Sequence, residues 1–245
     1  MTTDTADASP ATDRPVALIT GGGTGIGRAA AILLARGGHR VALVGRREAK
    51  LRDAGKELGT EGEDWIAVPG DIADPAQAAG VVDGTVGQFG RLDALVNNAG
   101  WSPLTPIGDQ TAETTRQIFD INAVGPIITI QHALPELLKH RGVVVNVSSV
   151  ATFDPFPGLG VYAAAKCAMN GIALALRNEY GDQGIRAFTV APGAVETDLL
   201  RSLIDKDTLP EAATLTPEEV AQVIVACVTG SRSEPSGSTI RVDSP

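Results

Sequence analysis

Short apolar segments alternate with helical patterns from Pro15 to about Val195, and this alternation constrains the fold more than any other feature. We expect strands at 16–19, 41–44, 65–68, 92–96, 142–147, 185–191 and 239–242. Between the first six we expect helices at 25–36, 47–58, 75–89, about 112–135 and 162–183. Near-continuous apolar strands joined by helical crossovers are typical of a parallel sheet covered on both faces. The sequence therefore predicts an α/β fold built on a single doubly wound parallel sheet.

The 245-residue chain shows no long linker or change of composition that would divide it, so we expect one domain over residues 15–245. Residues 1–14 are rich in Thr, Asp and Ala and lack the basic start and apolar stretch of a signal peptide. We expect them to form a disordered tail. No apolar run of about 18 residues occurs, so we expect no membrane span and a cytoplasmic location.

The charge and the metal-ligating residue types exclude several classes of partner. A net charge of −9 argues against binding to nucleic acid or to an anionic membrane, because those partners favour clustered Lys and Arg. The two cysteines, Cys167 and Cys227, do not have metal-ligand spacing, and the three histidines are scattered. We therefore expect neither a metal site nor a disulfide framework.

A glycine-rich segment, Thr20 to Gly27, joins the first strand to the first helix. Glycines allow a tight turn and the close approach of a pyrophosphate, and the helix N-terminus then offers free N–H donors. The spacing differs from G-x-G-x-x-G, and the Gly-Lys-Ser/Thr of an ATPase loop is absent. The position favours a nucleotide site, with an ordinary tight turn as the alternative.

Tyr162 and Lys166 lie four residues apart on an expected helix, and Ser149 lies thirteen residues before Tyr162. A spacing of four places the phenol and the ammonium on one helix face. A phenol has an ordinary pKa of about 10, and a nearby cation lowers it toward neutral pH. The pair is therefore a candidate proton donor and acceptor. The alternative is a surface helix that carries an unrelated Tyr and Lys.

Six motifs follow one another along the chain: Thr20-Gly-x-x-x-Gly-Ile-Gly27, Asn97-Asn-Ala-Gly100, Asn122, Ser149, Tyr162-x-x-x-Lys166 and Pro192-Gly193. In this order and spacing the chain resembles the short-chain dehydrogenase/reductase family over about residues 15–200, and within it the 3-oxoacyl-carrier-protein reductases. The resemblance implies a Rossmann-like domain with helices on both faces of its sheet. It also implies an oxidoreductase that binds NAD(H) or NADP(H) and interconverts alcohols and carbonyls.

The resemblance also implies which residues bind the cofactor. They are Gly21, Thr24, Gly25, Ile26, Gly27, Arg46, Asp71, Ile72, Asn98, Gly100, Tyr162, Lys166, Pro192, Gly193, Val195 and Thr197. Gly45 stands where NAD-selecting members have an acid, and Arg46 stands at the position of the NADP-selecting base. We therefore expect NADP(H) rather than NAD(H), because Arg can bind a 2′-phosphate with directed hydrogen bonds. Two solvated arginines at a helix start are the alternative.

Four residues are implied to perform the reaction: Asn122, Ser149, Tyr162 and Lys166. Tyr162 is expected to act as general acid or base, and Ser149 to polarise the carbonyl oxygen. Lys166 is expected to lower the tyrosine pKa and to bind the nicotinamide ribose, and Asn122 to kink its helix and hold a water beside the lysine. Read alone, Asn122 is a helix defect with its own backbone hydrogen bond. Ser148 is expected to support cofactor or backbone.

The substrate is the least constrained feature. Five residues are candidates for an apolar wall, with core positions as their alternative: Trp101, Leu104, Phe153, Phe156 and Leu159. They favour a small apolar carbonyl or alcohol substrate. We expect 199–215 to form a mobile lid, and helices around 117–138 and 162–180 to pair in a homo-oligomer, with a tetramer favoured. The alternatives are an NAD-dependent alcohol dehydrogenase, a sugar epimerase or dehydratase relative, and a catalytically silent nucleotide-binding regulatory protein.

Overall fold

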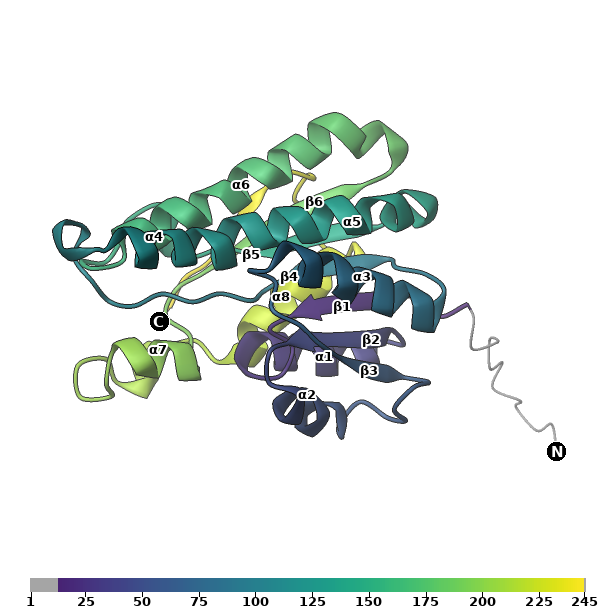
Figure 1. Cartoon of the computed structure of the whole chain (residues 1–245), viewed down its shortest axis with the longest axis horizontal. Coiled ribbons are helices and arrows are strands. Elements are labelled where there is room, and N and C mark those ends of the chain that lie inside the picture. The colour runs from purple at the N-terminus through teal and green to yellow at the C-terminus, as the bar shows by residue number, and fades with distance from the viewer. Residues whose placement is uncertain (1–12, 245) are drawn as a thin grey trace.

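A single parallel sheet of seven strands forms the centre of the computed structural model, which describes residues 13–244 (Figure 1). The strands are β1 (Val16–Thr20), β2 (Arg40–Gly45), β3 (Trp65–Pro69), β4 (Ala94–Asn97), β5 (Val143–Val147), β6 (Arg186–Pro192) and β7 (Thr239–Val242). Their order is β3-β2-β1-β4-β5-β6-β7, and every neighbouring pair is parallel. The predicted Rossmann-like α/β fold is therefore confirmed.

Helices cover both faces of this sheet. They are α1 (Gly25–Arg36), α2 (Glu48–Gly55), α3 (Pro75–Phe89), α4 (Ala112–Phe119), α5 (Gly125–His140), α6 (Gly160–Tyr180), α7 (Asp198–Leu203) and α8 (Pro217–Thr229). Helices α3, α5 and α6 lie over one face, and α1, α2 and α8 over the other, whereas α7 lies apart from both layers (Figure 1). None of the described helices is long and apolar enough to cross a membrane.

The core follows from the two-residue period of the strands. In β1, Ala17 and Ile19 face the α1 and α8 side, whereas Val16 and Leu18 face the α3, α5 and α6 side. All four side chains are fully buried. A strand that buries both faces must be apolar at every position, and this explains the unbroken apolar runs of the sequence.

The order in which the chain adds strands to the sheet reverses between β1 and β4. From β1 the chain winds outward through β2 to β3, then returns to pair β4 on the other side of β1 and continues to β7. In open parallel sheets, ligands bind outside the carboxyl ends of the strands at such a switch point. The strand ends at Thr20 and Asn97 place the glycine-rich segment and the Asn97–Gly100 motif at this point.

The helix expected over about 112–135 is interrupted around Asn122, where the resemblance implied a kink, and it ends later than expected. The structure has α4, then a π-helical turn over Asp120–Val124, then α5, which runs through Pro135 to His140. The side-chain amide of Asn122 donates to the carbonyl of Ile118 at 2.8 Å, which replaces a regular helical hydrogen bond. A turn of this kind inserted in a helix is frequent at functional sites.

Helix α8 was not expected, although a start signal precedes it. Thr216 accepts a hydrogen bond from the backbone of Glu219, and the Glu219 carboxylate accepts one from the backbone of Thr216, which together form a capping box. Pro217 occupies the first helical position. Val220 and Ile224 are fully buried in the core cluster that includes α1. The motif Thr-Pro-Glu-Glu before an apolar helical pattern was the missed signal.

The expected disordered tail, residues 1–14, ends in a residue that contacts the fold. Residues 1–12 lie outside the described residues. Arg14, the last residue of the expected tail, donates to Asp64 at 2.6 Å and to the carbonyl of Gly38 at 3.0 Å. Arg14, two residues before β1, is thus attached to the body of the fold.

Thr216→Ala removes the N-cap of α8 and should lower the free energy of unfolding by about 1 kcal/mol. Thr229→Ala is the matched control, because this threonine ends α8 and its exposed hydroxyl contacts only the carbonyl of Val225 and the exposed hydroxyl of Ser231 among the described residues. We expect the control to change stability by less than about 0.5 kcal/mol. Urea denaturation measures both variants, and equal effects would contradict the capping role.

Candidate functional site

A cavity of about 610 Å³ opens at the carboxyl ends of the strands. Every predicted site residue lines it except Gly27 and Asn122. The glycine-rich segment and Arg46 line one part, Ser149, Tyr162 and Lys166 another, and residues of α7 a third. The structure therefore brings together residues that are separated by more than half of the sequence.

The glycine-rich segment has the geometry of a phosphate cradle. Gly21 and Gly25 have φ values of 67° and 51°, where residues with a side chain are strained. A Cβ on Gly27 would collide with the carbonyl oxygen of Gly21, so this position keeps α1 close to the turn. Thr24, the N-cap residue of α1, makes no side-chain capping hydrogen bond. The first turn of α1 thus has free N–H groups for an anion, and the segment fits a dinucleotide pyrophosphate.

Arg46 lies at the rim of the cavity, directly after β2. Its side chain is 63% exposed, and its Nη1 lies 3.9 Å from Oδ2 of Asp71. Asp71 also accepts a hydrogen bond from the backbone of Ala73 at 3.0 Å. The N-cap residue of α3 is Asp74, whose side chain accepts from the backbone of Ala76 and Gln77. The exposed guanidinium of Arg46 can still meet an anionic group on a ligand, in competition with Asp71.

The Asn97–Gly100 motif ties the central strands together. The side-chain amide of Asn97 donates to Asn146 at 3.0 Å, which is a structural role. The amide of Asn98 donates to the carbonyl of Thr20 at 2.9 Å. Asn98 thus holds the glycine-rich segment in place while it lines the cavity. Direct contact between Asn98 and a cofactor stays a prediction.

Lys166 and Ser149 are fixed by the end of β5. The Nζ of Lys166 donates to the carbonyl of Val147 at 2.8 Å and lies 5.7 Å from the ring centroid of Tyr162. The Ser149 hydroxyl accepts from the backbone of Ala151 at 3.1 Å and also hydrogen-bonds to Tyr162. The Ser148 hydroxyl donates to the carbonyl of Lys166 at 3.2 Å, which supports the backbone as expected.

The pKa of Tyr162 shifts in the direction opposite to that expected from the sequence. Burial raises it to about 12, and the hydrogen bond with Ser149 lowers it only in part. Burial also lowers the pKa of Lys166 to about 8. Both groups lose water on folding, which disfavours the charged form of each, and the spacing of Tyr162 and Lys166 in the sequence does not show this burial.

Asn122 joins the π-helical turn to the wall of the site. Its side-chain amide donates to the carbonyl of Trp101 at 2.7 Å, and its Oδ1 accepts from the backbone of Trp101 at 3.3 Å. A Cβ on Gly100 would lie 2.9 Å from that Oδ1 and 3.2 Å from the Nζ of Lys166. Asn122 is thus both a helix distortion and a neighbour of the lysine. The water expected between them stays a prediction.

Thr197 is the N-cap residue of α7. Its hydroxyl oxygen accepts from the backbone of Leu200 at 3.2 Å. A Cβ on Gly25 would lie 3.0 Å from the Cγ2 of Thr197, so the start of α7 adjoins the glycine-rich segment. Val195 and Thr197 both line the cavity. Their contact with a nicotinamide stays a prediction.

The expected apolar wall is partly wrong. Trp101, Phe156 and Leu159 line the cavity, but Leu104 and Phe153 do not. Phe153 lies outside it, 51% exposed, with the guanidinium of Arg241 at 5.1 Å from its ring centroid. Leu104 instead contacts Gly158 in the neighbouring loop. Aromatic and aliphatic residues that are close to a site in sequence can thus face away from it.

The larger part of this wall comes from α7 and the loop that follows it. The apolar side chains of this segment that line the cavity are Leu199, Leu200, Leu203, Ile204 and Leu209. We expected a mobile lid over residues 199–215, but we did not assign any of these five side chains to the apolar wall. Four of these residues repeat at helical spacing, which was the available signal for an apolar helix face.

Comparison with known proteins agrees with this site. The family model for short chain dehydrogenases matches residues 15–208. An uncharacterized oxidoreductase of Thermotoga maritima is 36% identical over 197 residues, which cover 80% of this chain and 78% of that one. An uncharacterized oxidoreductase of Methylorubrum extorquens is 40% identical over 184 residues, 75% of this chain and 74% of that one.

Solved structures agree over nearly the whole chain. Levodione reductase superposes with a TM-score of 0.86 at 28% identity, over 94% of this chain and 96% of that one. A 3-ketoacyl-(acyl-carrier-protein) reductase from Brucella melitensis, complexed with NADH, superposes with a TM-score of 0.86 at 28% identity. The match covers 93% of this chain and 96% of that one. Fold, motif geometry and these matches lead to one conclusion. The chain belongs to the short chain dehydrogenase family and is an oxidoreductase.

Proposed function

We propose that this oxidoreductase interconverts a small apolar ketone and the corresponding secondary alcohol with NADP(H). One observation carries the proposal. Ser149, Tyr162 and Lys166 converge in the same cavity as the glycine-rich segment and Arg46. A proton donor thus lies beside a site that fits a dinucleotide, which is what a hydride transfer to a carbonyl requires.

The side chains divide the reaction between them. NADPH, when bound, supplies the hydride for the substrate carbon. The Ser149 hydroxyl donates to the substrate oxygen and stabilises the charge that develops there. Tyr162 donates its proton to that oxygen in reduction and accepts it in oxidation. Lys166 holds positive charge next to the phenol, and the carbonyl of Val147 fixes its Nζ. Asn122 holds Trp101 in the adjoining wall.

The preference for NADP(H) rests on Arg46. Its exposed guanidinium lies at the rim beside Gly45, and Gly45 has no carboxylate that would repel a 2′-phosphate. NAD(H) is the alternative, since the Brucella melitensis reductase is complexed with NADH. Asp71, 3.9 Å from Arg46, weakens the preference for NADP(H), because this carboxylate competes with a 2′-phosphate for the arginine.

The substrate class follows from the walls around Tyr162. Trp101, Phe156 and the leucines of α7 make this end apolar, and Asp154 and Asp198 bring negative charge to the same cavity. Negative charge here disfavours an anionic substrate and leaves an acyl carrier protein without a basic contact. We therefore favour a small uncharged ketone, and levodione is a suitable first probe because a structural neighbour is named for it.

We further propose a homotetramer that is formed through α4, α5 and α6. Val124 and Leu174 are both more than 40% exposed on the outer side of this layer. Apolar side chains of this size on neighbouring helices favour burial against a second copy. A cytoplasmic location stays a prediction from the sequence.

Tyr162→Phe should lower kcat by about 10²–10⁴-fold, because it removes the proton donor and leaves the ring in place. The Kd for NADPH should change by less than about threefold. Tyr180→Phe is the matched control, since Tyr180 ends the same helix and does not line the cavity. NADPH oxidation with a panel of small ketones measures kcat, and protein fluorescence measures Kd. Turnover close to that of the unmodified enzyme would refute the role of Tyr162.

Arg46→Gln should weaken NADPH binding by about tenfold or more and leave NADH binding nearly unchanged, because only NADPH carries the 2′-phosphate. Arg36→Gln serves as control, since this exposed arginine ends α1 and does not line the cavity. Isothermal titration calorimetry with NADPH and with NADH measures the Kd of each cofactor for the unmodified protein and both variants. A parallel loss of both affinities, or a native preference for NADH, would contradict the assignment.

Lys166→Met should abolish turnover and yet stabilise the fold by about 1–2 kcal/mol near neutral pH. Burial lowers the folded-state pKa from 10.5 to about 8, so the charged lysine costs stability wherever the unfolded chain binds the extra proton. The lost hydrogen bond to Val147 offsets part of the gain.

The pH dependence separates this effect from ordinary repacking. The advantage of Lys166→Met should be full below a pH of about 8 and disappear above about 10.5, where the lysine is neutral in both states. Lys56→Met is the control, because the exposed Lys56 pairs only with Asp53 at the surface. Denaturation midpoints over this range give the difference. An advantage that does not change with pH would contradict the account.

A further inference from the structure

Helix α7 carries the apolar wall of the cavity but has little that could hold it in place. It has six residues, and none of them is fully buried. A helix this short is not stable by itself in water. Leu199, Leu203 and Ile204 stay half-buried because they face the open cavity rather than a core. The position of the wall must therefore depend on polar contacts.

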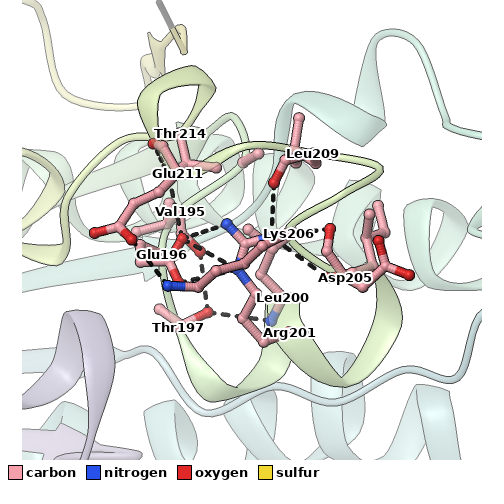
Figure 2. A network of polar contacts seen from close by, with 12 residues as sticks. Val195, Glu196, Thr197, Leu200, Arg201, Asp205, Lys206, Leu209, Glu211 and Thr214 are labelled. Atoms are coloured by element: carbon pink, nitrogen blue, oxygen red, sulfur yellow. Dashed lines mark hydrogen bonds and ion pairs between the residues drawn. The ribbon is translucent and has the colours of Figure 1, made fainter.

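Arg201 supplies these contacts from the middle of α7 (Figure 2). Its Nε donates to the two carboxylate oxygens of Glu196 at 2.9 and 3.1 Å, and its Nη2 donates to the same group. Its Nη1 donates to the carbonyl of Leu209 at 2.8 Å and to those of Asp205 at 3.2 Å and Ile204 at 3.5 Å. One guanidinium thus joins the helix, the following loop and the segment before the helix.

Glu196, the partner of Arg201, is anchored to the body of the fold. Its backbone donates to the carbonyl of Leu215 at 2.8 Å, next to the bridge between Val195 and Leu215. Its carboxylate also accepts from the hydroxyl of Thr214 at 3.4 Å. In sequence Glu196 lies between Val195 and Thr197, which line the cavity. The carboxylate therefore links the apolar wall to the segment expected to contact the nicotinamide.

The outer members of this network are weaker anchors. Lys206 donates to Glu211 at 2.8 Å, but their side chains are 60% and 66% exposed, against 17% for Arg201 and 23% for Glu196. Water and salt screen exposed pairs more strongly than half-buried ones. The hydrogen bonds from Arg201 also lower the pKa of Glu196, which keeps the carboxylate ionised. The inner pair is thus the main constraint on α7.

We propose that Arg201 and Glu196 are positioning residues that fix the apolar wall of α7 at a set distance from the reacting centre. The inference rests on the proposed function, because it assigns the substrate affinity of that site to this pair. Neither residue touches the reacting atoms. Their loss should release the wall, so that an apolar substrate loses contacts while the proton donor and the cofactor site stay intact.

The two residues should differ in effect. Arg201→Gln removes the contacts to Glu196 and to the three loop carbonyls together. Glu196→Gln leaves those carbonyl contacts, and its amide oxygen still accepts one hydrogen bond. Arg201→Lys keeps the charge but cannot make the forked contact, so we expect an intermediate effect. This order, with Arg201→Gln the most severe, is specific to the geometry of the network.

Hydrogen–deuterium exchange of the full-length protein tests the wall without any substrate. Arg201→Gln should raise the exchange rate of amides in residues 198–209 by about tenfold or more, and Glu196→Gln by less. Arg232→Gln is the matched control, because it breaks another Arg–Glu pair, with Glu234, in a loop that does not line the cavity. Unchanged exchange in Arg201→Gln would overturn the proposal.

Kinetics with NADPH and levodione tests the consequence for the substrate. Arg201→Gln should raise KM by about tenfold, with kcat and the Kd for NADPH changed by less than about threefold, and Arg201→Lys should restore part of the loss. A loose wall with an unchanged KM would refute the positioning role. If the unmodified enzyme reduces no ketone, the proposed function fails, while exchange still decides whether the pair fixes α7.

Discussion

The site depends on one buried charge, the ammonium of Lys166. It is 3% exposed, and the hydrogen bond that holds it goes to the carbonyl of Val147, at the end of a central strand. Burying a cation beside a dipole rather than a carboxylate is costly, as the lowered pKa shows. The surrounding chain is arranged around this group: Gly100 leaves room for it, Asn122 lies beside that gap, and Ser148 fixes its backbone.

The parallel sheet allows this arrangement to be built from distant segments. Each strand ends at the same edge, so the glycine-rich segment after β1, Ser149 after β5 and Thr197 after β6 meet in one cavity. The rigid strands position the reacting groups, whereas the polar contacts of Arg201 with Glu196 and Leu209 hold α7. A rigid centre with a separately held apolar wall lets chemistry and substrate choice vary independently.

The sequence was sufficient for features that obey a local rule, and insufficient for those set by contacts across the fold. Strand periodicity predicted the sheet, and the motifs identified candidate site residues that, apart from Gly27 and Asn122, line one cavity. The break at Asn122 could not be read from helical periodicity, because its hydrogen bonds to Trp101 depend on a distant loop. Likewise, burial and not sequence spacing decides the pKa of Tyr162, and only the fold turns Phe153 away from the cavity.

We propose that hydride and proton transfer occur at Ser149, Tyr162 and Lys166 in this cavity. Reduction of levodione with NADPH that carries deuterium at the transferable position of C4 tests it most directly. We expect one deuterium on the carbinol carbon of the alcohol, with the hydroxyl proton taken from solvent. Alcohol formed without deuterium at that carbon, or the same labelled product at undiminished rate from Tyr162→Phe, would contradict it.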